Sequence, residues 1–109
     1  MLNSLKLNKL YEEIYEPKLL PQDLLNNLSL KNYISVDFSK KDNFLQAVTK
    51  CYLANGQIST YVYTFNDLKL IKLVEKNSAD QSTILYDRQV EINKLKKELI
   101  SEENFTFVS

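Results

Sequence analysis

Two consecutive stretches of alternating apolar residues, 57–65 and 68–75, constrain this chain more than any other feature of its sequence. The first stretch is rich in β-branched and aromatic residues, which favour strands, and the second carries three leucines together with Ile71 and Val74. Asn66 and Asp67 lie between them, and both residue types tolerate the positive φ of a tight turn. The pattern predicts a β-hairpin whose two faces are both apolar, so both faces need cover from elsewhere in the fold. The expected cross-strand pairs are Phe65 with Leu68, Tyr63 with Leu70 and Val62 with Ile71.

Helices are expected on the N-terminal side of this hairpin. Residues 4–16 carry apolar side chains at helical spacing, with Ser4 as a candidate N-cap and Pro17 as the stop. A second, short helix is expected to begin at Pro21, because proline suits the first helical position. The apolar face of the first helix is predicted to consist of Leu7, Leu10, Tyr11 and Ile14.

Further elements are expected on both sides of the hairpin. Residues 33–38 alternate between apolar and polar side chains and predict a half-buried strand. Residues 77–81 are polar and predict a loop, after which 82–101 has helical periodicity. Residues 105–108 have the composition of a short terminal strand. The apolar stripe of the helix over 82–101 is predicted to contain Leu85, Ile92, Leu95 and Leu99.

Residues 42–54 fit two structures. Asn55 and Gly56 are typical of a tight hairpin turn, which would place strands on either side. At helical spacing, however, nearly all the apolar residues of this stretch fall on one arc, whereas a period of two places Gln46 and Lys50 among apolar residues. The periodicity therefore favours a helix that ends just before Gly56, and the strand alternative stays open.

The order of elements predicts an α+β fold. Two leading helices followed by β-α-β-β-α-β correspond to the ferredoxin-like split βαβ arrangement, an antiparallel sheet with both long helices on one face. If 42–54 is a strand, the alternative is an antiparallel β-meander flanked by N- and C-terminal helices. We expect one domain over 1–109, with a helical extension over 1–30 and an α/β sandwich core over 31–109.

Composition argues against most catalytic chemistry. The chain contains no His, one Gly and one Cys, which leaves no Ser-His-Asp or Cys-His pair, no glycine-rich phosphate loop and no zinc finger. We therefore expect no enzyme activity, no catalytic residues, no cofactor and no metal. Cys51 lies on the apolar arc and is expected to be a core residue. Glu12, Glu13 and Glu16 form the densest acidic group, which is expected to be a solvated helix face.

Charge and hydropathy bear on partners and location. Fourteen basic and fourteen acidic residues cancel, so no excess of positive charge points to nucleic acid. No apolar run is long enough to cross a membrane, and the N-terminus does not resemble a signal peptide. We expect a cytoplasmic protein. Lysine outnumbers arginine 13 to 1 and there are 11 Asn, which is a bias of AT-rich genomes and is compatible with a phage or mobile element.

The two apolar faces of the hairpin receive different assignments in this fold. One face is expected to lie under the helices, and it consists of Ile58, Val62, Ile71 and Leu73, joined by Ile34, Val36 and Phe38. The other is expected to point outward as the candidate partner-binding surface, and it consists of Tyr33, Tyr61, Tyr63, Phe65, Leu68 and Leu70. Three covers for this outward face stay open: the leading helices, a second copy in a homodimer, or another protein.

The expected function follows from this aromatic face. A surface rich in tyrosine is typical of protein interfaces, which favours a small non-enzymatic protein–protein interaction module: an adaptor, a complex subunit or a phage-type inhibitor. The alternative is a module that stacks single-stranded nucleic acid on the aromatic side chains. The third strand of the expected sheet lacks the Gly-containing basic-aromatic motif of RNA-recognition modules, so nucleic acid is the less favoured partner.

Overall fold

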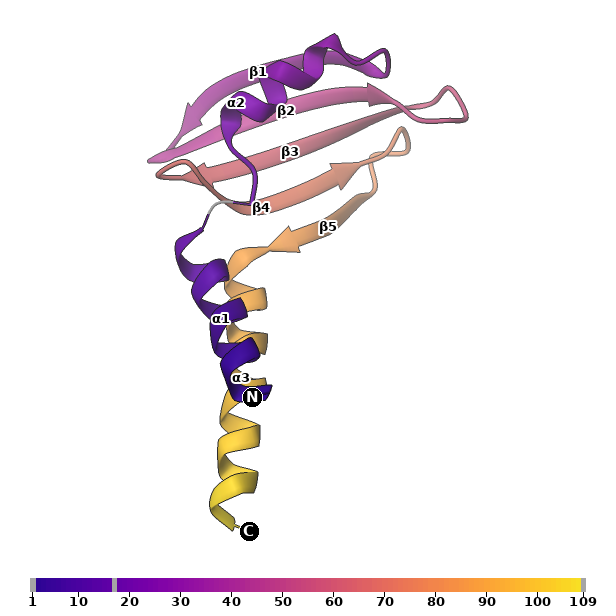
Figure 1. The fold of residues 1–109 in the computed structure, drawn as a ribbon. Coiled ribbons are helices and arrows are strands. Elements are labelled where there is room, and N and C mark those ends of the chain that lie inside the picture. Colours follow the sequence, from indigo (N-terminus) through magenta and orange to yellow (C-terminus); the bar gives the residue numbers. More distant parts are fainter. Residues whose placement is uncertain (1, 17, 109) are drawn as a thin grey trace.

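The protein is an antiparallel sheet with helices at both ends of the chain (Figure 1). The computed structural model describes the backbone of residues 2–16 and 18–108, and the side chains of residues 5–16 and 18–100. Within these residues, five strands follow one another as a meander in the order β1-β2-β3-β4-β5. The α+β class is therefore confirmed, whereas the ferredoxin-like order is wrong and the meander alternative is right.

The strands and helices have the following bounds. The sheet consists of β1 (Tyr33–Lys41), β2 (Phe44–Tyr52), β3 (Ile58–Asn66), β4 (Lys69–Lys76) and β5 (Ser82–Asp87). The helices are α1 (Leu2–Tyr15), α2 (Pro21–Asn26), which runs into the single 3-10 turn η1 (Asn27–Ser29), and α3 (Arg88–Val108).

The stretch for which helical periodicity was favoured is the strand β2. It lies between β1 and β3 and is paired antiparallel with both. The strand pattern was set aside because it places Gln46 and Lys50 on one face with Val48. Thr49 lies on the other face, where its side chain is fully buried with those of Ala47 and Cys51. Gln46 and Lys50 lie on the opposite, open face. β-branched Val48 and Thr49 suit a central strand, because they pack against neighbours on both sides.

The C-terminal elements also differ from the sequence prediction. Residues 82–87 extend the sheet as β5, and the helix begins only at Arg88. The carboxylate of Asp87 accepts a hydrogen bond from the backbone N–H of Val90 at 3.2 Å, which is N-cap geometry. The same helix continues to Val108, so the strand expected over 105–108 is absent. At the other end of the chain, α1 begins at Leu2 and Ser4 lies inside it.

The central hairpin has a different register from the one predicted. The turn consists of Asp67 and Leu68, one residue further along than expected, so Asn66 pairs with Lys69. An irregularity between Thr64 and Phe65 then shifts the remaining pairs. The observed pairs are Phe65 with Leu70, Tyr63 with Leu73 and Val62 with Val74.

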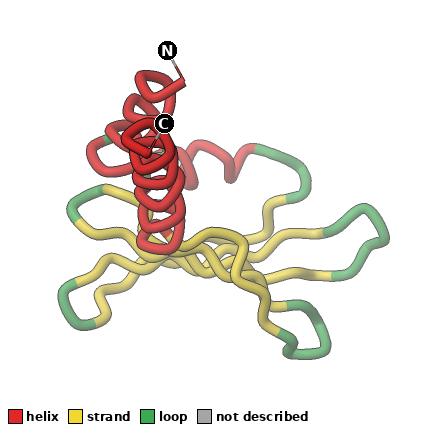
Figure 2. The backbone as a smooth tube through the Cα atoms, turned by 90° about the horizontal axis from the view of Figure 1, so that it is seen from below, coloured by secondary structure: helices red, strands yellow, loops and turns green. Residues whose placement is uncertain are grey.

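The helices lie on one side of the sheet and leave the other face uncovered by any described element (Figure 2). Leu24 of α2 is almost completely buried and packs on the sheet with Ala47, Phe65 and Leu70. The residues that surround this core are Leu19, Val36, Phe38, Leu45, Tyr63 and Tyr86. The segment expected to be a helical extension therefore supplies one of the most buried side chains of the sheet core.

A second, smaller core joins α1 to α3. Leu10 of α1 packs against Ile92 and Leu95 of α3, with Ile14 and Leu99 at the margins. The two helices run side by side away from the β5 edge, which gives the molecule extents of 55 × 29 × 26 Å (Figure 1). None of the described helices is long and apolar enough to cross a bilayer.

Gly56 provides a test of the β2–β3 turn. Its φ is +84°, and its N–H donates to the carbonyl of Leu53 at 2.9 Å. A Cβ added at this position would meet no atom within 4 Å, so a substitution acts through backbone strain alone. We expect Gly56→Val to lower the free energy of unfolding by about 1–2 kcal/mol in urea denaturation. Gly56→Asn should cost clearly less, because asparagine tolerates this conformation; equal stability of the valine variant and the wild type would contradict the assignment.

Candidate protein-interaction surface

Most of the residues predicted to bind a partner lie on the covered face of the sheet. Phe65 is 1% exposed and Leu70 is 5% exposed, and both contact the core around Leu24. Tyr63 stacks on Phe65 with ring centroids 6.4 Å apart, and burial raises the pKa of Tyr63 to about 12. The expectation that this face points outward is therefore wrong.

Tyr33 and Tyr61 belong to the same covered face. The strand pairing places Tyr33 opposite Cys51 and Tyr61 opposite Thr49, so both tyrosines line the buried row of β2. Both rings are only partly buried, and the Oη atom of Tyr33 accepts a hydrogen bond from the side-chain amide of Asn27 at 3.3 Å. The prediction divided the faces correctly only in part. Val36, Phe38 and Leu73 lie on the covered face as expected, whereas Val62 lies on the open face, because β2 is a strand and α2 covers the side that carries Tyr63.

Leu68 is the one predicted partner-binding residue that is well exposed. It occupies the tip of the β3–β4 turn with a φ of +66°, next to Asp67 with a φ of +49°. Its side chain is 61% exposed, so it contributes little to the core. Positive φ at both turn residues is typical of a type I′ hairpin, where Asn and Gly are the usual occupants. Leucine here combines backbone strain with exposure of an apolar side chain.

An exposed apolar stripe on α1 was not singled out from the sequence. Leu7, Tyr11 and Tyr15 follow one another at intervals of four residues, and all three are more than half exposed. The rings of Tyr11 and Tyr15 lie 4.8 Å apart with a tilt of 44°. We call these three residues the α1 ridge. The sequence analysis placed Leu7 and Tyr11 on one face with Leu10 and Ile14, whereas the structure turns only Leu10 and Ile14 toward α3.

The α1 ridge ends beside the β3–β4 turn. The ammonium group of Lys69 lies 5.8 Å from the ring centroid of Tyr15 and donates a hydrogen bond to the carbonyl oxygen of Ile14 at 3.3 Å. This contact fastens the C-terminal end of α1 to β4. Leu68 precedes Lys69 in the chain, so the ridge and the strained leucine lie at the same corner of the molecule.

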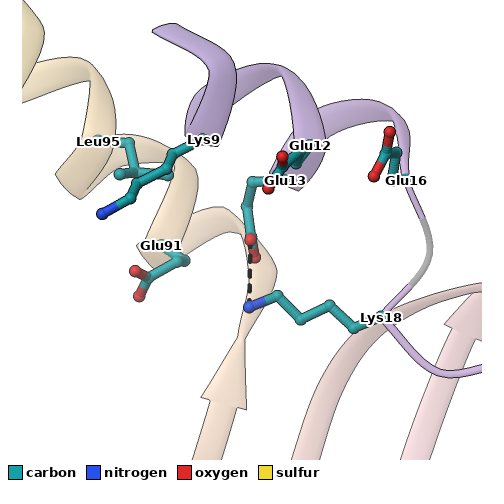
Figure 3. A pocket seen from close by; sticks show the side chains of 7 residues that line it. All are labelled: Lys9, Glu12, Glu13, Glu16, Lys18, Glu91 and Leu95. Atoms are coloured by element: carbon teal, nitrogen blue, oxygen red, sulfur yellow. Dashed lines mark ion pairs between the residues drawn. The ribbon is translucent and has the colours of Figure 1, made fainter. Parts of the chain in front are cut away.

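A hollow of about 370 Å³ lies on another side of α1, between α1, the segment that follows it and α3 (Figure 3). Its walls carry four carboxylates and two ammonium groups. The lining residues are Lys9, Glu12, Glu13, Glu16, Lys18, Glu91 and Leu95. Among the described residues, no group of three or more Asp, Glu, Cys or His side chains is arranged to hold a metal ion.

Glu13 connects the helices to the sheet. It is 6% exposed, although the sequence predicted a solvated face here. Its carboxylate accepts a hydrogen bond from the hydroxyl of Tyr86 in β5 and pairs with the ammonium of Lys18 at 3.3 Å, as Figure 3 shows for Lys18. The same ammonium lies 4.9 Å above the Tyr86 ring. We call Glu13, Lys18 and Tyr86 the Glu13 clamp.

A second cation, Arg88, acts on the Tyr86 hydroxyl of the Glu13 clamp. Burial raises the pKa of Tyr86, and the hydrogen bond to Glu13 raises it further, so the hydroxyl stays protonated as the donor. Arg88, the only arginine in the chain, is buried at the start of α3 and opposes this rise in the pKa. Its Nη2 atom finds no hydrogen-bond acceptor among the described residues. The charges here stabilise a junction between elements.

Comparison of the chain with protein-family models, with curated proteins and with solved structures finds no match.

Alanine substitutions at two adjacent residues, Glu13 and Glu12, test the Glu13 clamp. Glu13→Ala leaves the Tyr86 hydroxyl and the Lys18 ammonium without their shared acceptor, so we expect the free energy of unfolding to fall by about 1–3 kcal/mol. Glu12→Ala removes an exposed carboxylate from the same helix and should change it by less than about 0.5 kcal/mol. Urea denaturation measures both. Similar effects of the two substitutions would show that Glu13 has no special role.

Strain at Leu68 predicts a stabilising substitution. Because asparagine tolerates positive φ and little packing is lost, Leu68→Asn should raise the free energy of unfolding by roughly 0.5–1 kcal/mol. Leu5→Asn is the control, because Leu5 is also 61% exposed but lies in a helix. It should bring no gain. Thermal unfolding compares the two variants, and a Leu68→Asn protein that melts at or below the wild-type temperature would contradict the strain argument.

Proposed function

We propose that this chain is a small protein–protein interaction module that acts by occupying a surface on its partner rather than by catalysis. The observation that carries the proposal is the α1 ridge. Leu7, Tyr11 and Tyr15 form an uninterrupted apolar stripe without a charged side chain, on a helix that projects from the sheet. Contiguous apolar surface of this kind marks interaction sites in proteins that are otherwise polar outside.

The contacts that fix α1 in place support this proposal. The Glu13 clamp and the contacts of Lys69 hold the C-terminal end of the helix, while Leu10 and Ile14 hold its length against α3. A ridge on a helix fixed in this way loses little conformational entropy when a partner binds. Tyrosine adds a large contact area with few rotatable bonds, which is why it is enriched at protein interfaces.

The same geometry favours protein over nucleic acid as the partner. Stacking of bases requires accessible aromatic faces on the sheet, and α2 stands over the face that carries Tyr63 and Phe65. The carboxylates of Glu12 and Glu16 on the same helix line the hollow beside α1 and repel a phosphate backbone there. An adaptor, a complex subunit and an inhibitor would all use such a ridge.

Site-specific photo-cross-linking tests the proposal. A photoreactive phenylalanine analogue at Tyr11 should form an adduct with a protein in the cells that make this chain. The same analogue at Tyr52 is the control, because Tyr52 is 50% exposed but lies on the open face of the sheet. We expect the Tyr11 adduct to disappear when Leu7 and Tyr15 are both changed to Ser. Equal labelling from both positions, or an adduct with nucleic acid only, would overturn the proposal.

A further inference from the structure

We infer that the outer edge of β5 binds an extended, basic segment of another protein, which adds a sixth strand to the sheet. This goes beyond the proposed function, because the edge is a surface other than the α1 ridge. β5 is the last strand in the sheet order, and no other strand among the described residues pairs with its outer side. Figure 1 shows β5 at the border of the sheet, with α3 leaving from its C-terminal end. The backbone N–H and C=O groups along such an edge are complementary to those of an extended chain.

The two edges of the sheet differ in how they are protected against an added strand. β1, at the other edge, ends in Lys40 and Lys41, and η1 lies against this strand. Lysine on an edge strand and cover by another element both hinder pairing with a foreign strand. β5, in contrast, carries no charged residue and no proline from Ser82 to Tyr86. Of the two edges, the β5 edge is therefore the one suited to a partner strand.

A hollow of about 400 Å³ between β5 and the first turn of α3 provides a place for an apolar side chain of that segment. Ile84, Leu85 and Val90 line the hollow, and all three side chains are well exposed. Leu85 is a bulged residue, because its neighbours Ile84 and Tyr86 pair with consecutive residues of β4. A bulge re-aims side chains, and here two consecutive residues line the same hollow instead of pointing to opposite faces.

Negative charge next to this hollow selects a basic segment. Glu91 lines both the apolar hollow and the acidic hollow between α1 and α3. The acidic hollow contains four carboxylates and two ammonium groups, and one of these ammonium groups, that of Lys18, is already paired with Glu13. A segment that leaves the β5 edge beside Glu91 therefore meets an excess of negative charge. This complementarity favours a Lys or Arg in the segment, next to its apolar residue.

Selection from a library of random nonapeptides displayed on phage tests the inference with the full chain as target. We expect the enriched peptides to combine alternating apolar residues with a Lys or Arg at one end, because side chains along an added strand have a period of two. N-methylation of one alternate set of amides in a synthesised enriched peptide should abolish binding, and methylation of the other set should not, because only one edge of the peptide pairs with β5. Enrichment of helical sequences, or no enrichment, would overturn the inference.

Two pairs of matched variants place the peptide on the chain. Val90→Lys puts a charge into the apolar hollow and should weaken binding of the enriched peptide by about tenfold or more, whereas Ile100→Lys, at a similarly exposed position of the same helix, should leave it unchanged. Glu91→Lys should also weaken binding, and Glu98→Lys should not, because Glu98 lines neither hollow. Thermal unfolding confirms that all four variants are folded. Equal effects within either pair would contradict the site.

Two further measurements separate this inference from the other occupants and from the proposed function. The variant with both Leu7 and Tyr15 changed to Ser lacks the α1 ridge and should bind the enriched peptide as the wild type does. Loss of peptide binding in that variant would place the peptide on the ridge, which overturns the inference and leaves the proposed function intact. Sedimentation of the free chain should show no dimer that depends on Val90. A dimer that Val90→Lys abolishes would show a second copy at the β5 edge and would also overturn the inference.

Discussion

Packing of Leu24 on the centre of the sheet decides the rest of the structure. This single leucine of a six-residue helix is 1% exposed and contacts the core around Phe65 and Leu70. It selects which of the two apolar hairpin faces becomes the core. Val62 and Val74 are then left on the open face, where their β-branched side chains stand directly opposite each other across β3 and β4.

The position of α2 also determines what α1 can do. Because α2 and η1 already occupy the covered face, α1 cannot lie on it and packs against α3 instead, beside the β5 edge. Only the base of this helical pair touches the sheet, through the Glu13 clamp and Lys69. A helix with apolar residues on two sides then has one side without a partner among the residues that the structure describes, and this is the origin of the α1 ridge.

Several parts of the fold were predictable because local chemistry decides them. The hairpin strands, the polar loop over 77–81 and the short helix at Pro21 all follow from alternation, turn residues and proline. A positive φ at Gly56 was expected whether residues 42–54 formed a helix or a strand. β2 was mistaken because its open face mixes Gln46 and Lys50 with Val48, whereas Thr49, although polar, is fully buried on the covered face. Five of the six residues predicted to bind a partner lie on the covered face, because their exposure depended on which face α2 covers.

The sequence by itself determined that this chain has two apolar hairpin faces, seven tyrosines and no histidine, because these are properties of residue identity and spacing. Only the tertiary structure decided which tyrosines are accessible. Tyr63 stacks on Phe65 beside the core, whereas Tyr11 stands on an exposed helix. The physical reason is that a single helix face, that of α2, is available to cover the sheet, and the choice between two equally apolar faces depends on packing between residues distant in sequence.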